Sequence, residues 1–317
     1  MVSTPEIYSR LLLSHRHGYP LYHPEADLGL PSQYRRRGVS IGDVGIVTRD
    51  GSFDFLFNVC SSYAAVNPRE LPDDFELLQS DYLSCREYLR PKRHLFSDNV
   101  KQINDSPVAY ECSGPEGAVL ELPKGAMLFE ATNRCPFQDL AARHALNWYK
   151  YMFIDKARDA SNGSLYLVTG CVKAKEWGIA VFDRPSSSQD YLRFVADASP
   201  HEHDEDASYS WEMMGAVIAK IVPNTDDDDD DVITNDGEEH NQCLFLRGYK
   251  IMLREQIWNL LVNRQLDPAQ FLAQQETNRT NHEDQSGAPW GSDSEATLKP
   301  DPVQGVLLTE HFGVPLV

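Results

Sequence analysis

The chain has 317 residues, a mass of 35.9 kDa and a formal net charge of −19 at pH 7. Hydrophobic residues make up 41% of it and the mean hydropathy is −0.45, which is typical of a folded protein with polar insertions and excludes a collagen, a coiled coil and a wholly disordered chain. A pI near 4.8 argues against nucleic acid as a partner, because phosphate repels an acidic protein, and the basic run Arg35 to Arg37 is too short to change this.

The sequence predicts a cytoplasmic protein, with a nuclear location left open. It has no window of about 18 apolar residues, so we predict no transmembrane segment. The N-terminus lacks the basic region and long apolar run of a secretory signal. No cysteines form a C-x-x-C pair, so we expect reduced, buried thiols rather than disulfides. The six are Cys60, Cys85, Cys112, Cys135, Cys171 and Cys243.

Regular elements are indicated from the first residues onward. Thr4 followed by Pro5 predicts the start of a helix, because proline suits the first helical turn and apolar residues recur at helical spacing after it. Strands at 44–48 and 53–59 flank a turn that contains Gly51.

The middle of the chain alternates between helical and strand patterns. Apolar residues recur at helical spacing over 73–90 until Pro91, which predicts a helix there. Strands at 108–112 and 118–122 flank a glycine-containing turn, and 136–159 has the strongest helical pattern in the chain.

Two apolar, β-branched runs at 165–172 and 177–182 predict a long two-strand ribbon. A further strand is expected at 243–249 and a helix at 251–264, with a short final helix after Asp267.

Most of the negative charge lies in one segment. Residues 197–240 hold fifteen acidic residues against a single basic one, Lys220, a net charge of −14. Adjacent aspartates repel one another and do not pack, so we predict acidic loops at 197–210 and 224–240. The apolar stretch Trp211 to Val222 between them predicts one strand.

These patterns predict an α+β fold. No strand–helix–strand repeat with a glycine-rich phosphate loop occurs, so we expect a mainly antiparallel sheet packed with about four helices, an acidic loop insertion and a disordered C-terminal tail. Residues 1–273 are predicted to form a single domain, and 274–317 a mostly disordered tail, because the segment is rich in polar residues, Gly and Pro. Its apolar end, Val306 to Val317, either docks or stays loose.

Five segments together resemble a known family. They are HGYPLYHPE (17–25), RRRGVSIGDVGIV (35–47), DGSFDFLFNVC (50–60), SLYLVTGCVKAKEWGIAVF (164–182) and NQCLFLRGYKI (241–251). Over residues 4–260 the chain is similar to a large family of uncharacterised proteins expanded in mushroom-forming (agaricomycete) fungi. This resemblance implies no activity, cofactor or site residue. The order of hairpin, helix, ribbon and late strand also resembles the pore-forming domain of gasdermins, which is a likeness of topology only.

A few residues are candidates for chemistry. Gly38 to Gly42 matches G-x-S-x-G, but a nucleophile elbow needs a strand before the serine and a helix after it, and here the order is wrong, so we assign no catalytic role to Ser40. The metal candidates are His201, His203 and Asp204, which alternate in an acidic loop. We favour a solvated loop and predict no metal there, because a metal site needs a rigid surrounding shell.

Other polar residues have structural interpretations that we favour. His15 and His17 are expected at the C-terminus of the first helix, with Gly18 supplying its left-handed residue. His144 is expected to be a hydrogen-bonded core histidine, and nothing in the sequence pairs His94 with Asp43 as acid and base. Cys171 and Cys243 are expected to be inert core thiols, because burial raises a thiol pKa.

Three functions are therefore kept. The leading one is a non-enzymatic binding or interaction protein without a cofactor, with an unidentified protein as partner and no prediction of oligomeric state. The first alternative is a gasdermin-like, membrane-active domain, because the ribbon at 164–182 is long enough to span a bilayer. The second is an enzyme, a hydrolase, whose site is assembled from distant residues.

Overall fold

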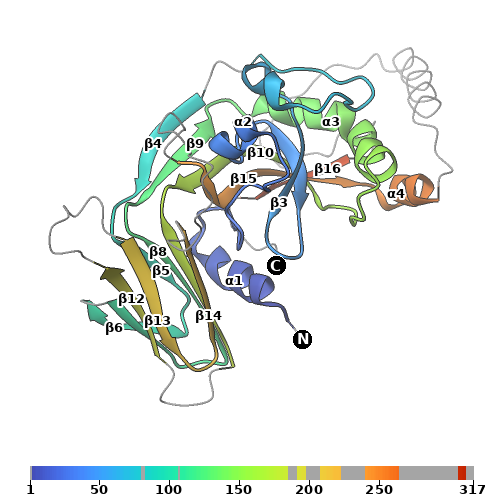
Figure 1. Ribbon diagram of the computed structural model, residues 1–317. Helices are drawn as coiled ribbons and strands as arrows, with labels where there is room; N and C mark the ends of the chain where they lie inside the picture. Colours follow the sequence, from blue (N-terminus) through green and yellow to red (C-terminus); the bar gives the residue numbers. More distant parts are fainter. Residues whose placement is uncertain are drawn as a thin grey trace, which may run out of the picture.

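Two β-rich lobes make up the structure, a computed structural model that describes residues 2–79, 83–105, 108–184, 191–197, 208–222, 240–263 and 306–311. One lobe is an eight-stranded sheet with helices against it, and the other is a pair of four-stranded sheets (Figure 1). The ladders between strands are antiparallel throughout the described part. The expected mixed fold with mostly antiparallel sheets is thus confirmed.

Two long strands form the centre of the eight-stranded sheet. β10 pairs with β15 along one side, and on its other side it pairs first with β2 and then with β9. The strands of this sheet are β1 (Tyr19–Pro20), β2 (Asp43–Val47), β3 (Phe53–Asn58), β4 (Leu83–Leu89), β9 (Ala126–Ala131), β10 (Leu165–Ala174), β15 (Gln242–Leu253) and β16 (Val306–His311). Of the apolar C-terminal stretch the structure describes residues 306–311, which form β16 and pair with β15.

The second lobe is a β-sandwich. One sheet has the order β14 (Val217–Val222), β11 (Trp177–Asp183), β8 (Glu116–Leu122) and β5 (Arg93–Phe96). The other has the order β13 (Ser208–Met214), β12 (Tyr191–Asp197), β7 (Val108–Cys112) and β6 (Val100–Asp105). Tyr110 and Leu192 of one sheet pack with Val119 and Phe182 of the other, so the two sheets face each other across one core.

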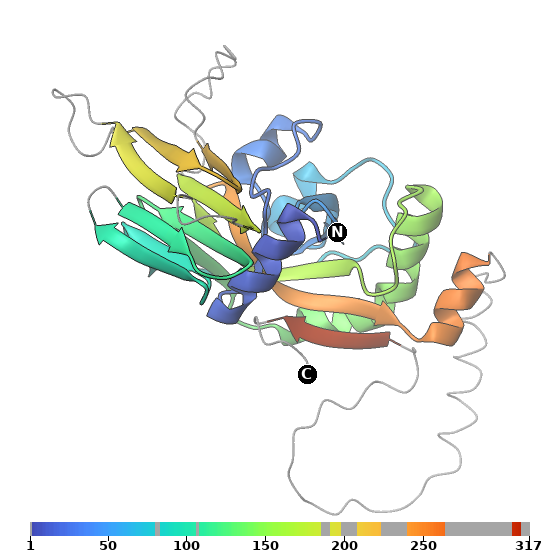
Figure 2. The same ribbon diagram turned by 90° about the horizontal axis from the view of Figure 1, so that it is seen from below.

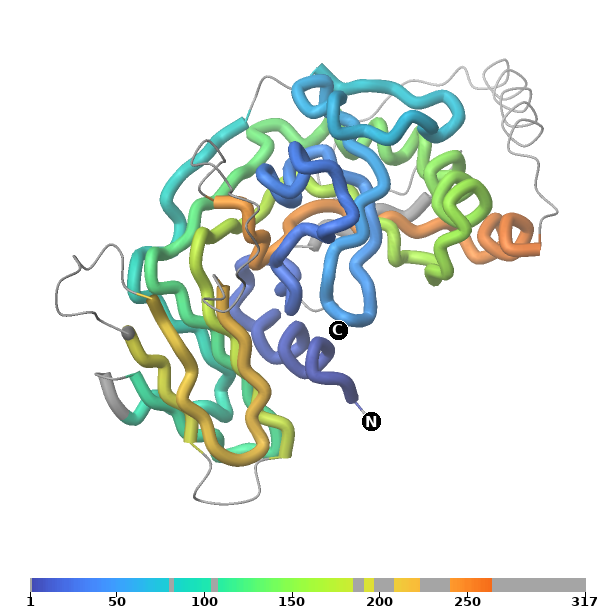
Figure 3. Tube along the Cα trace, viewed as in Figure 1, coloured from blue at the N-terminus to red at the C-terminus, as the bar shows by residue number. Residues whose placement is uncertain are grey.

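The lobes are joined by chain segments that leave one sheet and enter the other. β4 continues into β5, β8 into β9, and β10 into β11; Figure 3 shows these traces passing between the lobes. At the joint the Lys92 amide donates to the Pro123 carbonyl at 3.0 Å, and Lys124 pairs with Glu176 at 2.7 Å. Three continuous chain segments and the contacts at the joint therefore connect the two lobes.

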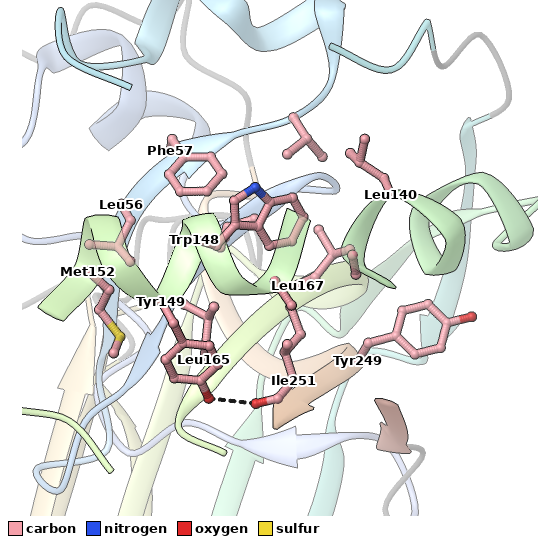
Figure 4. Close-up of a cluster of buried hydrophobic side chains, with 14 of the residues drawn as sticks. Leu56, Phe57, Leu140, Trp148, Tyr149, Met152, Leu165, Leu167, Tyr249 and Ile251 are labelled. Atoms are coloured by element: carbon pink, nitrogen blue, oxygen red, sulfur yellow. Dashed lines mark hydrogen bonds between the residues drawn. The ribbon is translucent and has the colours of Figure 1, made fainter. Parts of the chain in front are cut away.

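Helices cover the faces that the strands leave apolar. They are α1 (Thr4–Leu12), α2 (Ser32–Arg37), α3 (Cys135–Lys150) and α4 (Glu255–Val262), with 3-10 turns at Leu13–His15 and Ser61–Val66 and a π turn at Tyr151–Asp155 after α3. α1 lies in the angle between the lobes and packs on β8 and β11 (Figure 2). Trp148 of α3 packs on Phe57 of the sheet, and the Tyr149 hydroxyl donates to the Ile251 carbonyl at 2.7 Å (Figure 4).

The expected helix at 73–90 is wrong. The structure has β4 at Leu83–Leu89, paired with β9, and the described residues 73–79 form no helix. Asp74, at the start of the expected helix, has a left-handed backbone with φ 55°. Phe75 and Leu78 pack on the core from a loop instead, and pairing of the later residues with β9 overrides the local pattern. Three of the described helices have eight or more residues, where about four were expected.

Two strand predictions are also corrected. The single strand at Trp211 to Val222 is two strands, β13 and β14, which turn at Gly215 with φ 96° and join the edges of different sheets. The ribbon at 164–182 is not a pair, because β10 and β11 follow one another into different lobes and pair with other strands. None of the helices among the described residues has the length and apolarity that a membrane span requires.

Candidate functional site

A buried carboxylate, Asp43, organises the segment that carries the G-x-S-x-G pattern. Its Oδ1 accepts from Arg37 Nη2 at 2.9 Å and Asn58 Nδ2 at 2.6 Å, and its Oδ2 accepts from the Tyr34 hydroxyl at 3.0 Å and the Ser40 amide at 2.8 Å. Burial raises the pKa of Asp43, while Arg37 and the hydrogen bonds oppose that rise. The guanidinium of Arg37 also lies over the rings of Tyr34 and Tyr63, at 4.9 and 4.4 Å.

Ser40 is held in this network, with 4% of its surface exposed. Its hydroxyl donates to the Gly38 carbonyl at 3.2 Å and accepts from Lys173 Nζ at 3.2 Å, and the same ammonium donates to the Arg37 carbonyl at 2.7 Å. α2 precedes Ser40 and β2 follows it, the reverse of the order around a nucleophile elbow. A substrate would reach this serine only if the core opened.

His94 and Asp43 lie in different lobes and have different partners. His94 Nδ1, on β5, is 2.6 Å from Oε2 of Glu121, which is buried in the sandwich. The Tyr110 hydroxyl donates to the other oxygen of the same carboxylate. The structure therefore joins two strands of one sheet and a strand of the opposite sheet through one acidic side chain.

Three further histidines of the described part, His15, His17 and His144, are also engaged in hydrogen bonds. His15 ends the first helical region as expected, but the left-handed residue there is Arg16, with φ 60°. His17 Nδ1 is 2.9 Å from the Tyr88 hydroxyl, and burial, together with the neighbouring His15 and Arg247, lowers the pKa of His17 to about 4. His144 Nε2 lies 3.3 Å from Oε2 of the exposed Glu76, so His144 is hydrogen-bonded as expected, but it is half-buried at the edge of the core.

The cysteines divide into buried and exposed thiols. Cys60, Cys171 and Cys243 are buried, whereas Cys85 and Cys135 are exposed, so the expectation that all six are buried is wrong. Burial raises the pKa of Cys243, as expected, but a hydrogen bond to Cys243 lowers the pKa of Cys171. Sequence reasoning missed this because the neighbouring strand that supplies Cys243 lies about 70 residues away.

The predicted metal candidates His201, His203 and Asp204 lie outside the described residues, as does the aspartate run at 226–231. Within the described ranges, no group of three or more His, Cys, Asp and Glu side chains is placed to hold a metal ion.

The candidate binding site is an apolar groove on the eight-stranded lobe, with a cavity of about 400 Å³. Its apolar lining is Leu30, Pro31, Phe55, Leu56, Val66 and Pro68. β3 supplies the floor, since Phe55 and Leu56 are buried, and the segments before α2 and after the 3-10 turn at 61–66 supply the walls. A cavity of this size and apolarity is in the range that small ligands or single side chains fill.

Two basic side chains, Lys156 and Arg158, line the same groove. They follow the π turn, and the residue between them, Ala157, has a left-handed backbone with φ 50° that turns the chain here. Lys156 Nζ is 3.4 Å from a Glu70 carboxylate, and Arg158 Nε is 3.0 Å from an Asp54 carboxylate. These cations were not among the candidates from the sequence, because no motif marks them.

A second cavity, of about 490 Å³, adjoins the groove and shares Arg158 with it. Its lining includes the carboxylates of Glu25, Asp27, Asp50 and Asp54. Burial raises the pKa of Asp54, and hydrogen bonds from Thr48 and Ser52 outweigh burial to lower that of Asp50. The face therefore presents an apolar groove, two cations and then a group of carboxylates.

Comparison with family models, with curated proteins and with solved structures finds no match to this chain.

Proposed function

We propose that the chain is a non-enzymatic interaction module of the cytoplasm that binds a segment of another protein in the groove between β3, α2 and the turn at 156–158. The observation that carries this proposal is the combination in one cavity of a buried apolar floor with Lys156 and Arg158. The segment it fits has an apolar side chain for the floor and an acidic side chain beside it for the two cations.

The apolar floor supplies the affinity in this proposal. Burying one large apolar side chain against Phe55, Leu56 and Val66 stabilises a complex by about 1.5–3 kcal/mol. An anchor of that kind, inserted in a pocket, is typical of the residues that dominate protein interfaces.

The cations supply selectivity. The side chain of Arg158 is 50% exposed, and the Glu70 partner of Lys156 is 85% exposed, so both intramolecular pairs are surface pairs. Surface pairs of this kind contribute about 0–1 kcal/mol to stability. A carboxylate of the bound segment can therefore replace Glu70 or Asp54 as the partner of these cations with little loss of free energy. The carboxylates of the second cavity disfavour an acidic residue in the part of the bound segment that lies over them, and they favour a basic residue there.

Selection of random twelve-residue displayed peptides on the purified full chain tests the proposal. We expect enriched peptides to combine an aromatic or large aliphatic residue with Asp or Glu. Affinity for them falls at least about tenfold, equal to about 1.4 kcal/mol, in the variant K156E/R158E. The milder variant K156Q/R158Q lowers affinity by less, and raised salt weakens binding to the wild type.

A matched control is K101E/R193E, which makes the same charge change on exposed residues of β6 and β12 in the sandwich. It is expected to keep the wild-type affinity within about twofold, because charges beyond a Debye length of about 8 Å are screened. Enrichment of peptides whose binding is equally sensitive to both double variants contradicts a groove-specific interaction. Circular dichroism of each variant separates lost binding from lost folding.

The two alternative functions and the fungal family remain predictions from the sequence. Dye leakage from anionic vesicles tests the membrane-active alternative, and a turnover screen with ester, amide and phosphoester substrates tests the hydrolase.

A further inference from the structure

The groove lies along an open edge of the eight-stranded sheet. β3 is a terminal strand in the order of this sheet, and among the described strands β2 alone pairs with it. Phe55 and Leu56 of β3 line the groove, and Phe53 and Asp54 line the adjoining second cavity. The two cavities therefore follow one another along the same strand.

The peptide groups of Phe53 and Phe55 point to this edge. The Thr48 amide donates to the Ser52 carbonyl at 3.0 Å across the turn, so the peptide groups of Ser52 face β2. The direction alternates along a strand, so Asp54 also faces β2, whereas Phe53 and Phe55 face away from it. Both phenylalanines are less than one-tenth exposed, and no described residue outside β2 supplies a hydrogen bond to their peptide groups. Peptide groups at buried positions are nearly always paired with protein or water, so this part of the edge is available to a partner.

The same edge already has partners a few residues further along the chain. The Asn58 amide donates to Asn67 Oδ1 at 2.5 Å, and the Asn58 carbonyl accepts from Asn67 Nδ2 at 2.8 Å. The side-chain amide of Asn67 thus takes the place of a peptide group in a neighbouring strand. Beyond it, the Leu78 amide donates to the Val59 carbonyl at 2.7 Å. Among the described residues, the part of the edge without such a partner is 53–56, the part that lines the two cavities.

The walls of the groove come from the two faces of the sheet. On one face, Phe55 packs with Tyr34 of α2 in a cluster that also contains Val66. On the other face, Leu56 packs in the cluster that contains Trp148 of α3. Because successive side chains of a strand point to opposite faces, an extended chain over this edge directs its side chains alternately toward the α2 wall and the α3 wall.

The two walls differ in polarity. The α2 wall is apolar, since Leu30 and Val66 belong to the cluster beneath α2. The α3 wall carries both cations, because Lys156 Nζ lies 5.1 Å from the ring centroid of Tyr151 in the α3 cluster and Arg158 follows shortly after. A strand in the groove therefore presents an apolar side chain to one wall and, at the next position, an acidic side chain to the other.

We propose that the segment bound in the groove is extended and adds a ninth strand to the sheet, paired with Phe53 and Phe55 of β3. This inference rests on the proposed function and specifies the conformation of the bound segment. Each phenylalanine offers it one amide and one carbonyl, in the manner of strand addition to a sheet edge. At about 3.3 Å per residue, the residue over Phe53 lies two positions from the residue over Phe55. The carboxylates of the second cavity favour a basic side chain near the former.

A backbone scan of the tightest twelve-residue peptide from the display selection tests the added strand. Each amide of the peptide is N-methylated in turn, which removes one donor, and affinity for the full chain is measured by fluorescence anisotropy. We expect losses of at least about tenfold at alternate positions, whose amides donate to β3, and changes within about threefold at the positions between them, whose amides face solvent. Replacement of the same amides by esters removes the donor without adding a methyl group. It is the matched control and is expected to reproduce the alternation.

Residue-resolved amide exchange of the isotope-labelled full chain, followed by NMR, gives a second readout. In the free protein we expect the amides of Phe53 and Phe55 to exchange faster than that of Asp54, which faces β2. At a saturating concentration of the peptide we expect exchange at both phenylalanines to slow at least about tenfold and exchange at Asp54 to change less.

The outcomes separate this inference from the proposed function. Sensitivity at every consecutive position, as in a bound helix, or at no position overturns the added strand, and so does unchanged exchange at Phe53 and Phe55. If the affinity of that peptide still falls in K156E/R158E, the interaction function stands without the strand. Failure of every selected peptide to bind the groove overturns both.

Discussion

His94 Nδ1 and Glu121 Oε2 lie 2.6 Å apart, because the two residues are direct partners across the paired strands β5 and β8, and the carboxylate is 1% exposed. The second oxygen of Glu121 accepts from Tyr110, whose strand belongs to the opposite sheet of the sandwich. Burial and the adjacent carboxylate raise the pKa of Tyr110, so its hydroxyl stays a donor. The buried carboxylate of Glu121 thus forms hydrogen bonds with residues of both sheets of the sandwich.

Replacing His94 by alanine is expected to lower the free energy of unfolding by about 1–3 kcal/mol, because it removes a partner of a buried carboxylate. Urea denaturation of the single variants H94A and E121Q and of the double variant measures it. The double variant is expected to lose less stability than the sum of the two singles. Simple additivity contradicts a direct coupling between the two side chains.

Two aspartate substitutions test whether the contribution of an ion pair to stability depends on its burial rather than on the distance between its charges. D43N leaves the buried Arg37 without its carboxylate and is expected to cost about 3–5 kcal/mol in urea denaturation. D73N removes a partner that lies even closer to Lys150, at 2.5 Å, but Asp73 is 63% exposed, so we expect a loss of at most about 1 kcal/mol. Similar losses in the two variants contradict the central role of Asp43.

Gly38 is expected to tolerate no side chain. Its φ is 66° and its ψ is −169°, and a Cβ atom would lie 1.9 Å from the Asn241 carbonyl oxygen. G38A is therefore expected to lower the free energy of unfolding by at least about 2 kcal/mol, from backbone strain and the clash together. The control is G29A, because Gly29 is exposed and its Cβ would meet a flexible Asp27 side chain. A wild-type melting temperature for G38A contradicts this conformation.

The lowered pKa of His17 predicts how the stability of the protein depends on pH. Its pKa of about 4 lies below the ordinary value of 6.5, so the unfolded chain binds the proton first. Its contribution to stability is therefore complete above pH 6.5, is lost as the pH falls to about 4, and changes no further below that. We expect H17N to lose less melting temperature than the wild type between pH 7 and 4. Parallel curves for the two proteins contradict the burial of a neutral imidazole.

The sequence predicted the elements whose patterns are local. The helix that begins at Thr4, the α3 helix and the strands at 44–48, 108–112 and 165–172 have strong periodicity and clear turn residues, and the structure contains them. The helix at 73–90 failed because its spacing also suits a loop and a strand that pack on the core, and only the distant partner β9 decides between them.

The candidate site could not be predicted because its parts are far apart in the chain. Phe55, Val66 and Arg158 meet only when β3, the turn at 61–66 and the end of α3 pack together. The same is true of Cys171, whose lowered pKa depends on Cys243. The sequence did single out the segment 35–47, but the structure gives its Gly, Ser and Asp a role in packing rather than in chemistry.

Hydrogen exchange of the full chain with a selected peptide tests the central claim most directly. We expect slower exchange, relative to the free protein, in peptides that cover residues 26–34, 64–70 and 153–160, which carry the walls and the cations of the groove. We expect unchanged exchange in the sandwich strands. Protection confined to the sandwich, or none at a saturating peptide concentration, contradicts an interaction module that binds through this groove.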